Sequence, residues 1–264
     1  MIVEQIWTGN ALRNFNYLIA CPETGEALAI DPLDFEKCLG GAKDRGWDIT
    51  QVLNTHEHGD HTGGNMPVIE ATGAKLLAHR NAGPRIDGID VGLGAGDVVT
   101  VGKTVELLAL DTPGHTMSHI CLLSKTDAPA LFCGDTLFNA GAGNCHGGGH
   151  PEELYQTFTD QLDELPDDTL VYPGHDYILN NLGFTLDREP DNDAAAGLSR
   201  ELEGTHDPDN PIVTTIAQER EINTFFRLTS PSVIGKLKET FPDMDDEPTP
   251  EAVFLKLREL RNSW

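Results

Sequence analysis

The chain has 264 residues, 39% of them hydrophobic, with 27 glycines and 16 prolines, which is typical of a globular, turn-rich protein long enough to bury a substantial core. Its net charge of −25 argues against nucleic acids and anionic membranes as partners, because their phosphates would be repelled. There is no run of about 18 apolar residues to predict a membrane span, and the opening MIVEQIWTGN lacks the regions of a signal peptide. The five cysteines are odd in number and form no CxxC pair, so we expect reduced thiols and a cytoplasmic protein.

Short apolar runs separated by turns predict a sheet-rich first part. Seven such runs are expected to be strands: 16–20, 27–31, 50–55, 104–110, 119–124, 130–135 and 169–174. Between them, Asp34 can cap a helix whose apolar residues follow the i, i+3, i+4, i+7 pattern from Phe35 to Ala42. A second helix is predicted to begin at Pro151 and to bury Leu154, Phe158, Leu162 and Leu165.

After about Tyr177 strand signals become rare and helical signals dominate. The last helix is expected to begin at Thr249-Pro250-Glu251, where a capping hydroxyl, a proline suited to the first helical position and an acid come together. Its apolar stripe comprises Val253, Phe254, Leu257 and Leu260. We therefore expect two domains, residues 1–175 and 176–264.

The heptad THEHGDH, residues 55–61, carries three of the chain's 10 histidines and two acids. His56 and His58 are two residues apart, so in an extended turn both rings point the same way, whereas Glu57 points away and is expected at the surface. Asp60 and His61 follow at once, where GDHTGGNMP can start a helix. Neutral imidazoles and a carboxylate in this arrangement are typical of a metal site.

Metal-competent side chains also follow three other predicted strands. His115 lies in DTPGHT after strand 104–110, Asp135 ends strand 130–135, and His175 follows strand 169–174. Because sites gather where strand ends meet in layered α/β proteins, we expect these side chains to join the heptad. Seven ligands are too many for one tetrahedral ion and suit two ions that share a carboxylate and a water. An incidental histidine-rich loop would not explain why four separate strands end in this way.

The order H-x-H-x-D-H, followed later by His, Asp and His, resembles the metallo-β-lactamase superfamily over about residues 1–175. Three further stretches resemble glyoxalase II, the hydroxyacylglutathione hydrolase family: TPGHTMSH (112–119), CGDTLFNAGAG (133–143) and YPGHDYILNNLGFTLDREPDN (172–192). That family's helical domain is similar to EREINTFFR (219–227) and LKLRELRN (255–262). The resemblance implies an α+β fold, in which a metallo-β-lactamase αββα sandwich forms a catalytic domain (1–175) and is followed by a helical substrate-binding domain (176–264).

The resemblance also implies two metal sites and a bridging ligand: His56, His58 and His115 for one, Asp60, His61 and His175 for the other, and Asp135 between them. Tyr177, Arg258 and Arg261 match family positions that contact glutathione. The alternative is that the two arginines lie on an exposed face of the helix and form ion pairs with Glu259. His119, at the start of a strand four residues past His115, is expected to orient a ligand rather than to be one.

The activity implied by the resemblance is hydrolysis of S-2-hydroxyacylglutathione, such as S-lactoylglutathione, in methylglyoxal detoxification. Two divalent ions lower the pKa of water to about 7 and stabilise an oxyanion, so a bridging hydroxide can attack the thioester, with Asp60 and Asp135 as the catalytic carboxylates. The leaving thiolate has a pKa near 8.5 and needs no strong general acid. We expect zinc, although these ligands also suit iron and manganese, and a monomer that acts on a small-molecule thioester.

The loop after Asp135 departs from the family's pattern. Glyoxalase II usually has GCGRxFEG or GCGKxYEG here, whereas this chain has GAGNCHGGG at 141–149. Asn144 therefore stands where a basic residue meets glutathione, and His146 stands near an aromatic position. Both changes remove attraction or stacking for an anionic tripeptide, so a binuclear hydrolase of a different acyl thioester or ester is a second hypothesis.

Two alternatives come from other functional classes. A mono-iron persulfide dioxygenase shares the fold and a similar turn around His175, but it would fill one metal site and it typically lacks the long helical tail seen here. A binding module without activity is the other alternative. The complete set of seven ligands disfavours it, because buried ligands without a metal would be costly to keep.

Overall fold

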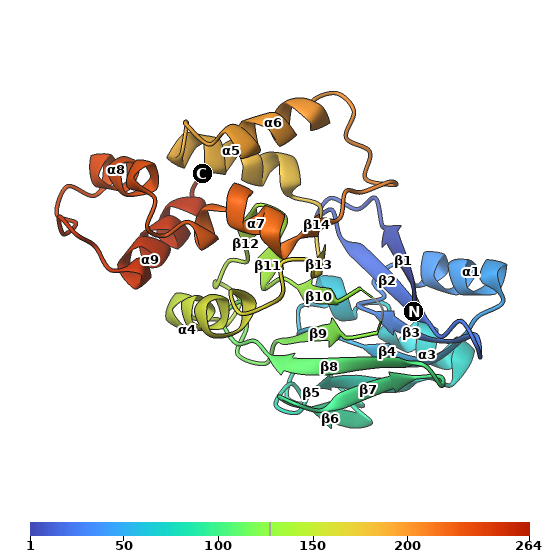
Figure 1. Ribbon diagram of the computed structural model, residues 1–264. Coiled ribbons are helices and arrows are strands. Elements are labelled where there is room, and N and C mark those ends of the chain that lie inside the picture. The colour runs from blue at the N-terminus through green and yellow to red at the C-terminus, as the bar shows by residue number, and fades with distance from the viewer. Residues whose placement is uncertain (127) are drawn as a thin grey trace.

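The fold is described from a computed structural model, which places residues 1–126 and 128–264. Two six-stranded sheets form its centre (Figure 1). The first sheet has the order β1 (Ile2–Trp7), β2 (Phe15–Ala20), β3 (Glu26–Ile30), β4 (Asp48–Leu53), β5 (Lys75–His79) and β6 (Val91–Leu93). The second has the order β14 (Thr214–Thr215), β13 (Leu170–Pro173), β10 (Ala130–Gly134), β9 (Ile120–Ser124), β8 (Val105–Asp111) and β7 (Val98–Val101). A two-stranded hairpin, β11 (Leu137–Phe138) and β12 (Gly141–Ala142), follows β10.

The strand directions decide where polar side chains gather. In the first sheet β3, β4, β5 and β6 run parallel, and in the second β10 and β13 run parallel. Because β9 is antiparallel to both β8 and β10, the carboxyl ends of β8, β10 and β13 lie at one edge of their sheet. The candidate ligands come after the strands that end at this edge or after β4, whose carboxyl end lies beside that of β3.

Alternation along the strands produces separate apolar layers. Between the two sheets, Phe15, Tyr17 and Ile19 pack with side chains of the second sheet such as Phe132. The intervening Leu18 faces the other way, into a core formed with helices α1 (Phe35–Arg45) and α3 (Asn65–Thr72). The outer face of the second sheet packs on α4 (Pro151–Thr157), the π-helical turn Phe158–Leu162 and the last helices. The result is a four-layer αββα sandwich, as predicted.

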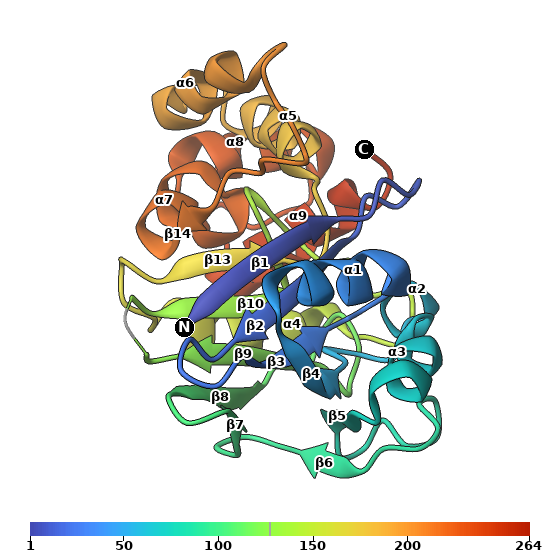
Figure 2. The same cartoon turned by 90° about the vertical axis from the view of Figure 1, so that its right-hand side faces the viewer.

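The remaining helices are short α2 (Gly59–Thr62) and a C-terminal group: α5 (Ile178–Arg188), α6 (Asp193–Leu202), α7 (Ile216–Ile222), the 3-10 turn Thr224–Phe226, α8 (Pro231–Thr240) and α9 (Pro250–Arg261). Figure 2 shows α5 to α8 gathered at one end of the sheets, beyond β13 and β14. The predicted caps are confirmed: Asp34 accepts the Lys37 N–H at 3.1 Å, and Thr249 accepts the Ala252 N–H at 3.2 Å.

The C-terminal group is continuous with the sandwich rather than loosely attached to it. Strand β14 extends the second sheet by pairing with β13. Val253, Phe254 and Leu257 of α9 are fully buried in the same core as Cys121 and Leu131 of the second sheet. Within the described residues, no helix combines the length and apolar character that crossing a membrane requires.

All seven predicted strands are present, within two residues at each end. The sequence analysis missed β1, β5, β6, β7 and the two-residue strands β11, β12 and β14. Strands β6 and β7 have three and four residues, too few for an alternating pattern to stand out. Strand β5 reads KLLAH, a short apolar run that pattern alone cannot separate from a buried helical turn.

Candidate metal centre

The seven predicted ligands come together at the carboxyl ends of the strands. His56 and His58 follow β4, and Asp60 and His61 lie in α2. His115 lies beyond β8, Asp135 directly follows β10, and His175 lies two residues past β13. Six of the seven form two groups, which we call site one (His56, His58 and His115) and site two (Asp60, His61 and His175). Within each group the ligand atoms lie within 4.8 Å of one another.

Imidazole nitrogens face each other in both groups. In site one, His58 Nδ1 lies 3.1 Å from His56 Nε2 and 3.0 Å from His115 Nε2. In site two, the Nε2 atoms of His61 and His175 are 3.2 Å apart. Asp60 Oδ2 lies 3.6 Å from the former and 3.5 Å from the latter.

Asp135 contacts both groups. Its Oδ2 lies 3.5 Å from His115 Nε2 of site one and 3.2 Å from His175 Nε2 of site two, and its Oδ1 lies 3.3 Å from His61 Nε2. Oδ1 is buried and has no hydrogen-bond partner among the described residues. A buried carboxylate oxygen without a donor is costly, which indicates that a cation belongs beside it.

In three of these histidine rings, the outward nitrogen, which points away from the centre, contacts a main-chain carbonyl. This contact determines which ring nitrogen carries the proton. The outward nitrogens of three rings lie 2.6–3.2 Å from main-chain carbonyls: His115 Nδ1 from Asn144, His175 Nδ1 from Leu12, and His58 Nε2 from Gly147. A carbonyl oxygen only accepts, so each of these nitrogens donates, and the opposite nitrogen presents a lone pair to the centre. Lone pairs 3.0 Å apart repel one another unless a cation lies between them.

The electrostatics agree with a cation site. Burial, together with neighbouring His61, lowers the pKa of His56 well below its usual value, so this ring is neutral and able to coordinate. Burial also disfavours charge on His61, but the Asp135 and Asp31 carboxylates outweigh it and raise its pKa to about 9. Burial likewise opposes the charge on Asp135, yet His175 and His61 hold its pKa well below the usual range. The carboxylates thus create a potential that attracts positive charge.

The spacing fits divalent ions. A tetrahedral ion with bonds of about 2.0–2.1 Å separates its ligand atoms by about 3.3 Å. The observed separations run from 3.0 Å between His115 and His58 to 3.6 Å between Asp60 and His61. Together with the unpaired Oδ1 of Asp135, these spacings match the donor set of two metal ions.

Asp31 is a buried carboxylate at this centre that the sequence analysis missed. It follows β3 with a left-handed backbone (φ 49°) and accepts hydrogen bonds from the Thr55 N–H (2.8 Å), the Thr55 hydroxyl (2.6 Å) and His61 Nδ1 (2.9 Å). It therefore orients His61. The available signal was its position: like Asp135, it ends a strand whose carboxyl end lies at the ligand edge.

His119 is placed as predicted, next to the ligands. Its Nε2 accepts the Asp135 N–H at 3.2 Å, and its ring stacks on His56 with centroids 5.1 Å apart. The expectation that Glu57 lies at the surface is wrong, because Glu57 is only 9% exposed. Its carboxylate accepts from Arg85 at 2.9 Å and from Thr116 at 3.0 Å, so neighbouring loops cover it.

A cavity of about 220 Å³, which we call the small cavity, adjoins the centre. Tyr177 on its wall stacks on His175, with ring centroids 4.9 Å apart and planes within 6°. The structure brings all five predicted substrate-binding residues to this cavity, which is lined by Phe138, Ala142, Asn144, His146, Tyr177, Asn181, Arg258, Arg261 and Asn262.

The two arginines differ in their surroundings. Arg258 is 4% exposed, and its Nη1 donates to the carbonyls of Ala142 (2.7 Å) and Gly143 (3.0 Å). Burial lowers its pKa to about 10. Arg261 is half-buried and donates to Asn181 Oδ1 at 3.1 Å. The exposed-face alternative is thus wrong for Arg258, since Glu259 pairs with Lys256 at 2.8 Å.

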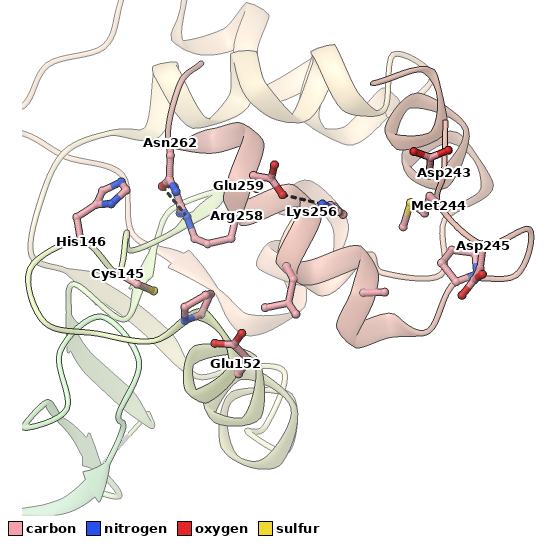
Figure 3. Close-up of a pocket in the computed structure, with 14 residues that line it drawn as sticks. Cys145, His146, Glu152, Asp243, Met244, Asp245, Lys256, Arg258, Glu259 and Asn262 are labelled. Carbon is pink, nitrogen blue, oxygen red and sulfur yellow. Dashed lines mark hydrogen bonds and ion pairs between the residues drawn. The ribbon is translucent and has the colours of Figure 1, made fainter. Parts of the chain in front are cut away.

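A larger cavity of about 680 Å³ lies between α4, α9 and residues 243–248. Figure 3 shows Arg258, Asn262 and His146 at one end of it, with Asp243 and Asp245 at the other. It shares these first three residues with the small cavity, and no residue of site one or site two lines either cavity. The small cavity, however, is lined by Phe138 and Tyr177, whose rings contact His175, and by Asn144, whose carbonyl accepts from His115. The chemistry of the metal centre therefore points to the small cavity.

Comparisons with known proteins agree with this geometry. Residues 17–175 match the metallo-beta-lactamase superfamily, and residues 176–264 match the hydroxyacylglutathione hydrolase C-terminus. The chain is 70% identical to a hydroxyacylglutathione hydrolase of Polaromonas sp. and 66% identical to one of Nitrosococcus oceani, in each case over the whole of both chains. Among solved structures it is similar to ETHE1 from Myxococcus xanthus, with 28% identity, a TM-score of 0.69, and coverage of 99% of this chain and 98% of that one.

Proposed function

Since the chain belongs to the hydroxyacylglutathione hydrolase family of the metallo-beta-lactamase superfamily, we propose that sites one and two hold two divalent ions and that the small cavity receives the glutathione part of the substrate. The enzyme is a metal-dependent hydrolase of hydroxyacylglutathione. One observation carries the assignment of the site: lone pairs and an unpaired carboxylate oxygen converge beside a cavity whose wall, Tyr177, stacks on His175.

In this proposal each site has its own ion. His56, His58 and His115 hold one, Asp60, His61 and His175 hold the other, and Asp135 bridges them. We propose zinc for both, because imidazole and carboxylate ligands at these spacings suit it, while iron and manganese accept the same donors. The contacts of Asp135 with both groups support the bridging role.

Two bound divalent ions would lower the pKa of water to about 7 and polarise the thioester carbonyl. The chain's own residues set the charge around that reaction. Asp60 and Asp135 neutralise only part of the ionic charge, so the centre stays positive where an oxyanion develops. Asp135, with its hydrogen bond from main chain to His119, fixes the separation of the two sites. The departing thiolate, with a pKa near 8.5, requires no strong acid.

The small cavity supplies the contacts for the thiol carrier. Arg261 is the half-buried cation on its wall, and Tyr177 offers an aromatic face next to the reacting carbonyl. Asn144 and His146 are exposed at its rim, where they can contact the carboxylates of the tripeptide. Arg258 shapes the wall by holding the carbonyls of Ala142 and Gly143. The acyl part, a 2-hydroxy acid such as lactate, then faces the metal centre.

We further propose a catalytic domain at residues 1–175 and a helical substrate-binding domain at 176–264. A monomer is supported because the seven ligands of the centre come together within one chain. A cytoplasmic location is supported by the five cysteines, all of which are free thiols.

We expect two metal ions per chain in protein purified without chelator, because both ligand groups are complete. Elemental analysis of the purified enzyme measures this directly, alongside thioester hydrolysis and oxygen consumption on a glutathione persulfide. A single iron per chain together with oxygen consumption would replace the hydrolase proposal by the mono-iron dioxygenase alternative.

The variant Asn144→Lys is expected to lower KM for S-lactoylglutathione about fivefold at low salt, because a partly exposed charge-assisted contact strengthens binding of the anionic carrier. The gain should shrink with added salt, since screening acts over about 8–10 Å at physiological ionic strength. Turnover at saturation should hold, because the contact lies on the carrier and not on the attacked carbonyl.

The matched control for this charge change is Asn81→Lys, at an exposed asparagine that does not line the small cavity. It should leave KM unchanged. A higher KM in Asn144→Lys, or an equal decrease in KM in both variants, would contradict a contact between residue 144 and the carrier.

A further inference from the structure

Residues 139–143, which we call the hairpin segment, are held by side chains of the C-terminal group one after another. This segment contains the turn after β11 and strand β12, and it ends next to Asn144. Its contacts are Asn181 Nδ2 to the Asn139 carbonyl (2.9 Å), the Ala140 N–H to Glu219 Oε2 (2.8 Å), Asn223 Nδ2 to the Gly141 carbonyl (3.1 Å), and Arg258 Nη1 to the carbonyls of Ala142 (2.7 Å) and Gly143 (3.0 Å). The main chain of every residue in the segment therefore forms a hydrogen bond with a side chain from beyond residue 176.

Glu219 of α7 is the centre of these contacts. It is fully buried, and besides the Ala140 N–H its carboxylate accepts from the Thr214 hydroxyl at 2.6 Å and from Asn223 Nδ2 at 3.0 Å. Burial raises its pKa to about 7, so keeping a carboxylate here opposes stability. A buried acid of this kind is better explained by the geometry it imposes than by the stability it adds.

The geometry that Glu219 imposes is unusual. Ala140 has φ 57°, in the left-handed region that non-glycine residues rarely adopt. Its N–H has the Glu219 carboxylate as its acceptor, which supports the turn from outside. At the next residue, a Cβ added to Gly141 would lie 2.5 Å from Asn181, so the turn also has little room to relax.

The hairpin segment ends at two groups that belong to the site. On one side is Phe138, whose ring meets His175 and Tyr177 edge-on, with centroid distances of 5.7 and 5.2 Å, and lines the small cavity. On the other side is Asn144, whose carbonyl accepts from His115 Nδ1 at 2.6 Å. A shift of the segment would therefore move a cavity wall and the partner of a site-one ligand together.

We propose that Glu219 is a positioning residue: by holding the main chain of Ala140, it sets Phe138 against His175 and the Asn144 carbonyl against His115. The C-terminal domain thereby shapes both the small cavity and site one, in addition to supplying contacts for the carrier. This inference rests on the proposed roles of the cavity and of site one.

The test compares Glu219→Leu and Glu219→Gln with the control Glu221→Gln, which changes an exposed acid on the same helix. Glu219→Leu should raise KM for S-lactoylglutathione and speed metal loss to a chelator by about tenfold, the lower end of what losing the partner behind a metal ligand costs. Glu219→Gln retains an acceptor for the Ala140 N–H and should recover most of both losses. The control should match the wild type.

A second pair of variants keeps the inference testable if Glu219→Leu does not fold. Because glycine adopts φ near 57° without strain, Ala140→Gly should reduce the effect of Glu219→Ala, which removes the acceptor, on KM and on chelation when the two are combined. If Glu219→Leu lowers only the melting temperature and leaves KM and chelation unchanged, Glu219 is merely structural and the inference is wrong. If Ala140→Gly does not reduce the effect of Glu219→Ala, the left-handed turn is not what Glu219 supports, and the inference is wrong.

The wild type separates this inference from the proposed function. A wild type with fewer than two ions, or without thioester hydrolysis, overturns the proposed function itself. A wild type with both properties, beside Glu219 variants that behave like the control, overturns only the positioning role.

Discussion

Replacing Asp135 with alanine is expected to lower kcat/KM by on the order of a thousandfold, more than the loss of any single histidine of the centre. The reason is that the Asp135 carboxylate contacts both ligand groups, through Oδ1 to His61 and Oδ2 to His115 and His175. Its removal leaves the repulsion between the two ions uncompensated and their separation unset. Steady-state kinetics with S-lactoylglutathione, together with metal content per chain, measures the effect.

The matched control is Asp111→Ala, which removes another aspartate from the end of a strand of the same sheet. Asp111 is partly exposed and pairs with His79 at 3.5 Å, outside both ligand groups. It should leave metal content and kcat near the wild-type values. An Asp135→Ala enzyme that keeps two tightly bound ions and near-normal turnover would refute the bridging role.

The variant Gly174→Ala is expected to lower kcat about a hundredfold, since displacing reacting groups by about 1 Å can cost that much. A Cβ at this position would lie 2.3 Å from Asp135 Oδ1 and 3.0 Å from His61 Cε1. The backbone cannot yield, because the Gly174 N–H donates to Gly134 and its carbonyl accepts from Phe15, at 2.7 and 2.8 Å. The methyl group would therefore displace the Asp135 carboxylate, and metal content should fall with activity.

Gly40→Ala is the control for this substitution. Gly40 lies in α1, and a Cβ there meets no other atom within 4 Å, so alanine should stabilise the helix slightly and leave catalysis unchanged. Full metal content and normal kcat in Gly174→Ala would show that Asp135 tolerates displacement and that its position is not fixed by β13.

The metal centre was accessible from the sequence because its signals are local. His56, His115 and Asp135 each follow or end an apolar run, so the tendency of sites to gather where strand ends meet was enough to predict that they would come together. Asp31 and Glu219 were not found, because their roles depend on the partners they meet in space. Asp31 acts through Thr55 and His61, and Glu219 acts on Ala140, 79 residues away in the chain.

Burial of charged side chains was the least predictable property. Alternation placed Glu57 at the surface, but loops from other parts of the chain cover it with Arg85 and Thr116. Arg258 occupies the apolar side of α9 because two main-chain carbonyls satisfy its guanidinium. These groups, which contact Glu57 and Arg258, lie far from them in the sequence and are brought to them by tertiary packing, so no local sequence pattern could predict the burial of either side chain.

The pairing of β14 with β13 has a consequence for how the protein is made. A nascent chain that has reached only residue 175 exposes the outer edge of β13, because its partner, Thr214–Thr215, has not yet been synthesised. The core beneath the second sheet also lacks Phe254 and Leu257, which are fully buried and belong to α9. Unpaired strand edges and open apolar surfaces promote aggregation during synthesis. The sandwich is therefore completed only after α9 has been synthesised, and the hairpin segment beside site one acquires the last of its supports, Arg258, at the same stage.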